Sequence, residues 1–160
     1  MEGKMALYLV QHGLSAAKDV DPEKGLTEHG KAETGRIAQV AQGYDIHVEK
    51  IVHSGTKRAE QTAMIYHDVL SVGASMEIAA DIGPLDDVRT FAETAAAEKN
   101  MMVVGHLPYM ERLVSYLVTG SSEIFVYKFQ NSGIVCLDQG SGESEQKGWF
   151  IKWTLNPNIS

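Results

Sequence analysis

Met5-Ala-Leu-Tyr-Leu-Val-Gln-His-Gly13 is the stretch that decides the fold, because an apolar run ends there in a histidine. Met101-Met-Val-Val-Gly-His106 repeats this pattern later in the chain. Short apolar runs of this kind indicate buried strands. Ligands of open α/β sheets bind at the carboxyl ends of the strands, so two such strands can deliver their histidines to one pocket. We therefore expect His12 and His106 to lie close together.

A third strand-like run brings an arginine to the same edge of the expected sheet. Lys50-Ile-Val-His-Ser54 is followed closely by Arg58. Arg58 falls in the first turn of an expected helix, where unpaired backbone N–H groups and the helix dipole favour an anion. Two histidines and an arginine at three strand ends predict an anion site. Phosphate suits it best, because the guanidinium fork can donate two hydrogen bonds to one phosphate.

Apolar runs alternate with segments of helical periodicity along most of the chain. The expected strands cover 6–10, 50–54, 76–79, 101–105, 124–129, 133–137 and 149–153. The expected helices cover 27–43, 56–71, 87–98 and 108–118, and a turn is expected over 140–145. Such alternation implies helices on the faces of a largely parallel sheet. We predict an α/β fold, a three-layer α/β/α sandwich in which at least one of the last strands is antiparallel.

Composition narrows the possible functions. The 160 residues suit one domain over 1–160, and the net charge of −7 argues against nucleic-acid binding, which needs a basic face. Cys136 is the single cysteine, so we expect a buried thiol and a reducing compartment. No apolar stretch approaches the roughly 18 residues of a membrane span, and no signal peptide is recognisable, which predicts a cytoplasmic protein without membrane contact. No residue cluster has metal-ligand spacing, so neither a metal nor a cofactor is expected.

Four short motifs, in order, give the sequence a family resemblance. They are Gln11-His-Gly13, Leu26-Thr-Glu-His-Gly30, Ser54-Gly-Thr-Lys-Arg-Ala-Glu-Gln-Thr-Ala63 and Gly105-His-Leu-Pro108. With these motifs the chain resembles the histidine phosphatase superfamily, also called the phosphoglycerate mutase-like family. It looks most like the small bacterial phosphohistidine phosphatases of the SixA type. The resemblance covers most of the chain and implies a phosphoglycerate mutase-like fold with phosphatase activity.

The resemblance also implies a role for individual residues. His12 matches the nucleophile, which holds the phosphoryl group as phosphohistidine before passing it to water. Arg58 binds a phosphate oxygen. His106, protonated or donating a hydrogen bond, stabilises the charge that develops during transfer. Gln11 and Gly13 complete the expected phosphate-binding set, the glycine because it allows the backbone to approach closely.

Two positions depart from the family pattern. Gln11 stands where the family has an arginine, and a neutral amide offers fewer donors and no charge. Losing a preorganised charged donor commonly costs a factor of about 10²–10³ in rate. Lys18 or Lys57 could supply the missing charge. Gly55 replaces a family proline in the turn before Arg58, which predicts a looser turn there.

The general acid is the least determined part of the expected site. Asp86 and Asp87 are the candidates, with Asp81 nearby, and either of the first two could instead cap the helix expected over 87–98. A phosphorus–nitrogen bond to a protonated imidazole has a good leaving group, whereas an alkyl phosphate needs a proton delivered. The chemistry therefore favours phosphohistidine as substrate.

We expect the partner to be a phosphorylated protein or a small phosphorylated molecule. A phosphoglycerate mutase holds a second anionic group on long insertions, for which this chain is too short. Two alternatives remain open on the sequence alone. One is a catalytically impaired module that binds phosphate or phosphoproteins, which Gln11 favours. The other is a small-molecule phosphomonoesterase, which needs one of the candidate aspartates directed into the pocket.

Overall fold

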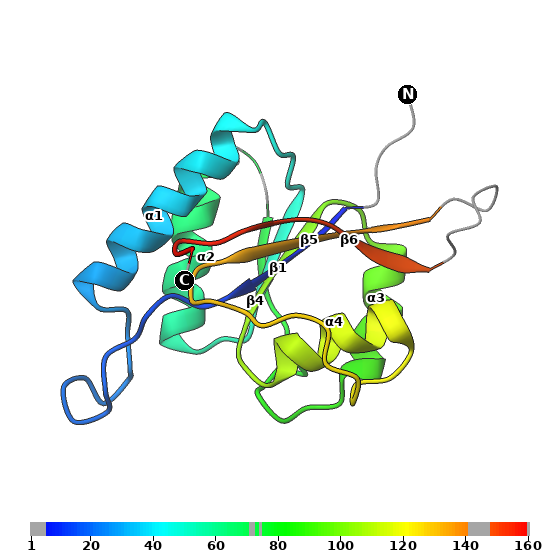
Figure 1. The fold of residues 1–160 in the computed structure, drawn as a ribbon. Coiled ribbons are helices and arrows are strands. Elements are labelled where there is room, and N and C mark those ends of the chain that lie inside the picture. Colours follow the sequence, from blue (N-terminus) through cyan, green and yellow to red (C-terminus); the bar gives the residue numbers. More distant parts are fainter. Residues whose placement is uncertain (1–5, 71–72, 74, 141–147, 160) are drawn as a thin grey trace.

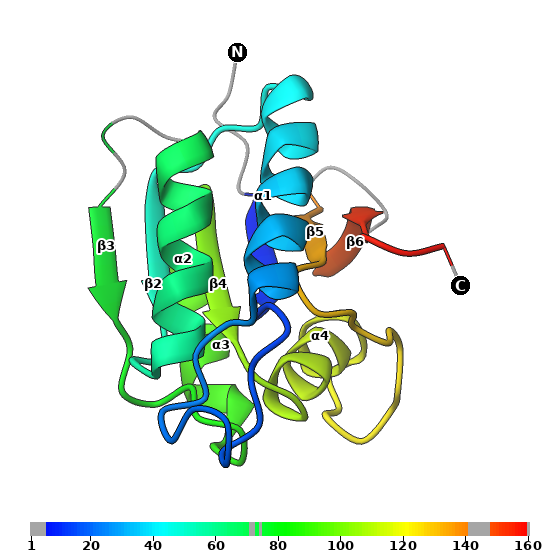
Figure 2. The ribbon, with the colours of Figure 1, turned by 90° about the vertical axis from the view of Figure 1, so that its left-hand side faces the viewer.

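A six-stranded sheet with helices on both faces forms the part of the chain that the structure, a computed structural model, describes: residues 6–70, 73, 75–140 and 148–159 (Figures 1 and 2). The elements in order are β1 (Leu7–Gln11), α1 (Glu28–Gly43), β2 (Lys50–His53), α2 (Lys57–Leu70), β3 (Ser75–Ile78), α3 (Val88–Ala97), β4 (Met101–Gly105), α4 (Tyr109–Thr119), β5 (Ile134–Gln139) and β6 (Trp149–Leu155). Helices α1 and α2 pack on one face and α3 and α4 on the other. The predicted three-layer α/β/α sandwich is confirmed.

The order of the strands is β3-β2-β4-β1-β5-β6. Strands β3, β2, β4 and β1 are parallel neighbours, whereas β5 is antiparallel to both β1 and β6. The prediction of a mostly parallel sheet with an antiparallel C-terminal strand is therefore confirmed. In the β1–β4 pair Gln11 lies opposite Gly105, so the next residue of each strand reaches the carboxyl edge at the same level.

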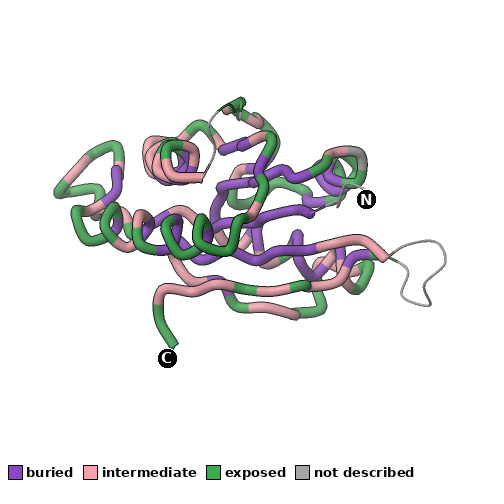
Figure 3. Tube along the Cα trace, turned by 90° about the horizontal axis from the view of Figure 1, so that it is seen from above, coloured by how far each residue is buried: buried purple, intermediate pink, exposed green. Residues whose placement is uncertain are grey.

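The central strands are apolar without interruption because both of their faces are covered. Leu9 and Val103 belong to the core under α3 and α4, while Val10 and Val104 belong to the core under α1 and α2. All four are completely buried. Parallel sheets covered on both sides read as continuous apolar runs for this reason. Figure 3 shows the same layering, with buried chain in the middle and exposed turns on the outer sides of the helices.

The start of α1 is fixed close to the end of β1. Thr27 caps the helix as expected, its hydroxyl accepting a hydrogen bond from the Gly30 N–H at 2.9 Å. A Cβ at position 30 would overlap the carbonyl oxygen of Leu14. This glycine therefore lets the first turn of α1 lie directly against the chain that leaves β1.

Two of the expected elements are not found as predicted: one is wrong, and the other lies mostly outside the described residues. The strand expected over 124–129 is wrong, because this segment has no regular structure and packs against α4, where the Phe129 N–H donates to Glu111 at 3.1 Å. The inner strands β1 and β5 are already paired on both edges, so neither can take the segment as a neighbour. The turn expected over 140–145 lies mostly outside the described residues. The other expected strands and helices are present, with bounds that differ by up to two residues.

Candidate active site

His12 is held at the end of β1 by three hydrogen bonds. Its N–H donates to the Gly105 carbonyl at 3.0 Å, and its own carbonyl accepts from Asn131 Nδ2 at 2.9 Å. The ring Nδ1 lies 2.7 Å from the carbonyl oxygen of Gly13, which can only accept. Nδ1 therefore carries the proton, and the lone pair is on Nε2. This is the tautomer that a nucleophile attacking through Nε2 requires.

The pKa of His12 lies below its usual value. Burial of the ring is the largest cause, and it outweighs the opposing hydrogen bond to Gly13. The positive charges of Arg58 and Lys24 lower the pKa further. His12 is therefore neutral at pH 7, and its Nε2 lone pair is available.

His106 faces His12 from the neighbouring strand. The two ring centroids are 5.2 Å apart, and His106 is almost fully buried. Its Nε2 lies 2.6 Å from the hydroxyl of Ser54, while its Nδ1 has no hydrogen-bond partner among the described residues. Burial is the largest cause, followed by the positive charges of protonated His12, of Arg58 and of Lys24, and together they lower the pKa of His106 to about 4. The ligand-free ring is neutral, so of the two states expected from the sequence the structure favours a neutral donor.

Arg58 completes the group from the first turn of α2. Its carbonyl accepts a hydrogen bond from the Thr62 hydroxyl at 2.8 Å, and that same hydroxyl oxygen accepts the Gly13 N–H at 2.9 Å. This pair of bonds ties the helix start to the chain beside His12. The charge of Arg58 acts on His12 and on His106, lowering the pKa of each. The structure thus brings all three expected residues to one edge of the sheet.

The structure requires a glycine at position 13 for a different reason from the one expected. Its N–H donates to Thr62, so in this structure it is not directed at an anion. A Cβ there would lie 2.7 Å from Thr34 Oγ1 and 3.1 Å from Ser132 Oγ. The glycine is required because a buried polar cluster packs against it, and direct phosphate contact by Gly13 stays a prediction.

Gln11, the last residue of β1, lines a cleft at the end of that strand. The cleft has a volume of about 380 Å³ and is also lined by His29, Glu33, Leu107 and Asn131, among others. The amide Oε1 is buried and has no hydrogen-bond partner among the described residues. An unpartnered buried amide is costly. An amide oxygen can only accept, so the partner that Gln11 Oε1 lacks is a hydrogen-bond donor, and binding of phosphate by Gln11 stays a prediction.

Of the two lysines expected to replace the missing arginine, Lys57 is already engaged. Its Nζ lies 3.2 Å from Asp21 Oδ2 and 3.2 Å from Glu23 Oε2. A lysine neutralised by two carboxylates supplies little field to an anion. Lys18 is exposed in the loop after β1. The positive charge that acts on both histidines besides Arg58 belongs to Lys24, which the sequence analysis did not single out.

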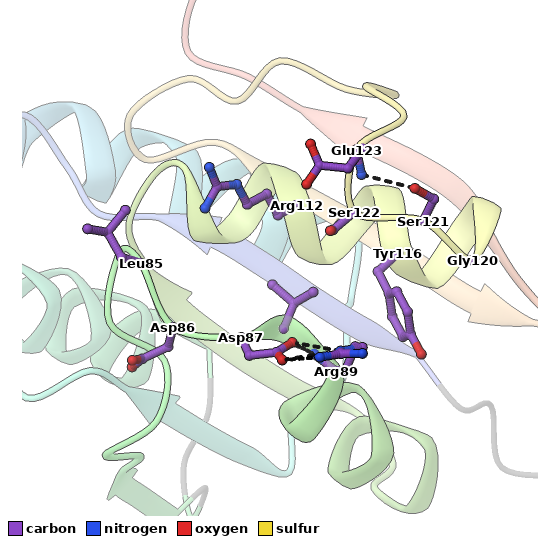
Figure 4. A pocket seen from close by; sticks show the side chains of 11 residues that line it. Leu85, Asp86, Asp87, Arg89, Arg112, Tyr116, Gly120, Ser121, Ser122 and Glu123 are labelled. Carbon is purple, nitrogen blue, oxygen red and sulfur yellow. Dashed lines mark hydrogen bonds and ion pairs between the residues drawn. The ribbon is translucent and has the colours of Figure 1, made fainter.

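The candidate general acids have other partners. Asp87 caps α3, and Arg89 binds its carboxylate with a shortest distance of 2.7 Å. Arg89 lowers the pKa of Asp87 to about 2, which leaves no proton to donate near neutral pH. Asp86 accepts the Gly83 N–H at 2.7 Å. Both aspartates line a cleft of about 500 Å³ between α3 and α4, and neither His12 nor His106 lines this cleft (Figure 4). The helix-capping alternative is confirmed for Asp87, and a role for Asp86 as acid stays a prediction.

The residues that support His12 include several that sequence reasoning missed. Asn131 binds its carbonyl, and Ser132 next to it contacts Thr34 Oγ1 at 2.6 Å. The hydroxyl of Tyr66 on α2 donates to the carbonyl of Ser132. The available signal was the Asn-Ser-Gly turn before β5, because a polar turn between apolar runs marks where a loop passes strand ends.

Neither a metal cluster nor a membrane helix is found in the described part of the chain. No group of three or more histidine, cysteine or acidic side chains there could hold a metal ion. No helix among these residues is long and apolar enough to cross a membrane. Cys136 is buried, as expected.

A neutral strand-end histidine with its Nε2 unprotonated, a second histidine facing it and a helix-borne arginine are the parts of a phosphoryl-transfer site. In sequence and in fold the chain is similar to SixA-like proteins of the histidine phosphatase superfamily. It is 26% identical to phosphohistidine phosphatase SixA of Escherichia coli strain K12, in an alignment that covers 96% of this chain and 94% of that protein. No protein-family model matches the sequence.

Solved structures share the fold. A protein histidine phosphatase SixA complexed with tungstate superimposes with a TM-score of 0.80 at 23% identity, covering 95% of this chain and 97% of that one. A putative phosphohistidine phosphatase SixA from Agrobacterium tumefaciens gives 0.75 at 23% identity, with 98% and 100% covered. A mycobacterial glucosyl-3-phosphoglycerate phosphatase gives 0.69 at 14% identity, with 92% and 96% covered. The expected phosphoglycerate mutase-like fold is confirmed.

Proposed function

We propose that this protein is a phosphohistidine phosphatase that acts on a phosphorylated histidine of another protein. The observation that carries the proposal is the hydrogen bond from His12 Nδ1 to the Gly13 carbonyl at 2.7 Å, since it leaves the lone pair on Nε2 beside His106. The similarity to the Escherichia coli phosphohistidine phosphatase supports the same reaction. A cytoplasmic location is part of the proposal, supported by the single, buried cysteine, which suits a reducing compartment.

The reaction proceeds in two transfers. Nε2 of His12 attacks phosphorus, the bond from phosphorus to the substrate nitrogen breaks, and its electron pair stays on that nitrogen. The substrate imidazole, which is protonated on its other ring nitrogen, leaves as the neutral ring. Water then attacks the phosphohistidine, the bond from phosphorus to Nε2 breaks, and inorganic phosphate leaves as His12 regains its lone pair. Arg58 and His106 donate hydrogen bonds to the phosphoryl oxygens throughout. An imidazole that is protonated on its other nitrogen leaves without further help, so the substrate does not require Asp86.

The test is the detection of a phosphoryl adduct by intact mass after incubation with phosphoramidate or a phosphohistidine peptide. The wild type should gain one phosphoryl group transiently, and His12→Ala should gain none and lose turnover while keeping its fold. His47→Ala is the matched control, because His47 is an exposed histidine on a loop whose ring lies 3.9 Å from the Glu49 carboxylate. Adduct formation in His12→Ala would identify a different nucleophile. Phosphate binding without any adduct in the wild type would support a phosphate-binding module, the alternative that Gln11 suggests.

A further inference from the structure

The segment 21–26 is fixed against the first turn of α2. The Leu26 N–H donates to Gln61 Oε1 of that helix at 2.7 Å. The Gly25 N–H donates to the carboxylate of Asp21 at 2.9 Å, and Lys57 of α2 pairs with the same carboxylate. A Cβ on Gly25 would lie 2.8 Å from the Lys57 side chain, so the loop and the helix are in direct contact there. The segment therefore lies beside the helix turn that presents Arg58.

Lys24 occupies the centre of this fixed segment. Its N–H donates to the Asp21 carbonyl at 2.8 Å, and its backbone φ is 54°, in the left-handed region that lysine seldom adopts. The side chain is partly buried. Among the described residues no carboxylate lies within ion-pair distance of its ammonium, whereas the neighbouring Lys57 has two. A left-handed lysine held in one place and left without a counter-ion indicates a functional demand at that position.

The candidate active site has little positive charge of its own. Its histidines are neutral, and Gln11 carries no charge, so Arg58 is the one fixed cation among the residues expected to bind phosphate. A phosphoryl dianion brings two negative charges into this partly buried space. The loop that carries Lys24 is fixed against the helix turn that presents Arg58, which brings a second positive charge to this side of the site. In line with this placement, the charge of Lys24 lowers the pKa of both His12 and His106.

We propose that Lys24 is the second phosphate-binding cation of this site and takes over the charge that Gln11 lacks. The ammonium binds a non-bridging phosphoryl oxygen from the loop side, while Arg58 binds from the helix side. The expected effect of Lys24 on turnover rests on the proposed phosphatase function, whereas its expected effect on anion binding does not. A point charge suits this place because an ammonium, unlike a guanidinium, needs no planar bidentate geometry.

The test measures binding of inorganic phosphate by calorimetry and turnover of a phosphohistidine peptide. We expect Lys24→Met to weaken phosphate binding by about 10-fold or more and to lower kcat/KM by at least as much, while Lys24→Arg keeps most of both. Lys31→Met is the control for a lost surface charge, because Lys31 lies on the exposed side of α1 and pairs with Glu28. It should change neither quantity by more than about twofold.

Lys24→Gly separates a functional from a structural role. Glycine relieves the left-handed backbone, so the melting temperature should stay the same or rise while phosphate binding falls as in Lys24→Met. Adding Gln11→Arg to Lys24→Met should restore about 10-fold of the lost turnover, because it returns a cation to the position where the family has one. The same Gln11→Arg change in the wild type should have a much smaller effect.

Two results would overturn the proposal. One is phosphate binding by folded Lys24→Met that equals that of the wild type. The other is a loss caused by Lys18→Met instead, which would assign the role to that lysine. Failure of the proposed phosphatase function is distinguishable: the wild type would then bind phosphate with Lys24-dependent affinity yet never form a phosphoryl adduct. Adduct formation that is indifferent to Lys24 would retain the function and reject this inference.

Discussion

At the scale of single residues, the site has two distinguishing properties. The proton of His12 is fixed on one ring nitrogen, and few side chains in the site carry a positive charge. The Gly13 carbonyl fixes the proton of His12 on Nδ1, so that Nε2, the nitrogen that we propose as the nucleophile, is unprotonated before any substrate arrives. Burial keeps His106 neutral as well. Two adjacent imidazoles can remain this close because neither is charged, and an entering dianion would favour protonation of one of them.

The lowered pKa of His106 predicts a pH-dependent stability. In the unfolded chain this histidine binds a proton near pH 6.5, whereas in the folded protein it does so only near pH 4. Between these values the unfolded state binds more protons, so the free energy of unfolding falls as pH falls, by about 1–3 kcal/mol in all. Urea denaturation of wild type and His106→Asn between pH 4 and 7 measures the difference.

The variant should show a shallower loss of stability across that window. His53, whose pKa is also lowered, contributes in the same direction and does so equally in both proteins. The pKa of His12 is lowered too, but its charge is coupled to that of His106, so the difference between the two curves measures His106 together with this coupling. Parallel curves for wild type and variant would show that His106 is protonated equally in folded and unfolded protein.

At the scale of elements, the parallel strands could be predicted because burial on both faces leaves a sequence signal. Runs such as 101–105 are buried at every residue, and each is followed by a helix that packs on the sheet. The segment 124–129 is equally apolar in sequence, yet Ile124 and Phe125 are exposed and the segment lies on α4. Strand formation there needed a free sheet edge, which only the complete topology reveals.

The candidate site was predictable where its residues follow strands and not where they depend on packing. His12, Arg58 and His106 come directly after apolar runs or at a helix start, so local sequence places them. Asn131 and Lys24 reach the site from loops whose path is set by contacts with distant elements. No periodicity marks such residues, and their part in the site emerges only from the folded chain.

Two glycines of α1 predict opposite effects of the same substitution. Gly30→Ala places a methyl group on the Leu14 carbonyl oxygen, whereas Gly35→Ala meets no atom within 4 Å. We expect Gly30→Ala to lose about 1–3 kcal/mol of stability and to lower turnover, because Leu14 lies two residues after His12. Gly35→Ala should gain about 0.5–1 kcal/mol without affecting turnover. Chemical denaturation and peptide assays measure both; equal stabilities of the two variants would show that α1 shifts freely away from the β1 loop.

At the scale of the whole molecule, a small cationic site is carried by a protein of net charge −7. The positive groups that act on the site, Arg58 and Lys24, come from α2 and from the loop that crosses its start. The cleft next to Gln11 is lined by amides, apolar side chains and the His29–Glu33 pair, with neither lysine nor arginine in its described lining. The site thus suits one phosphoryl group, while the rest of the surface repels further negative charge.

This charge distribution predicts a preference among phosphohistidine peptides. A peptide whose phosphohistidine is flanked by lysines should be hydrolysed with a kcat/KM about 10-fold higher at low ionic strength than one flanked by glutamates, because net charge steers association over long range. The ratio should decrease toward unity as salt is raised to 1 M, where the screening length falls to about 3 Å. Initial-rate measurements at several salt concentrations, with an uncharged flanking sequence as reference, test this. A preference for glutamate flanks, or a ratio that salt leaves unchanged, would show that local contacts and not the overall charge select the substrate.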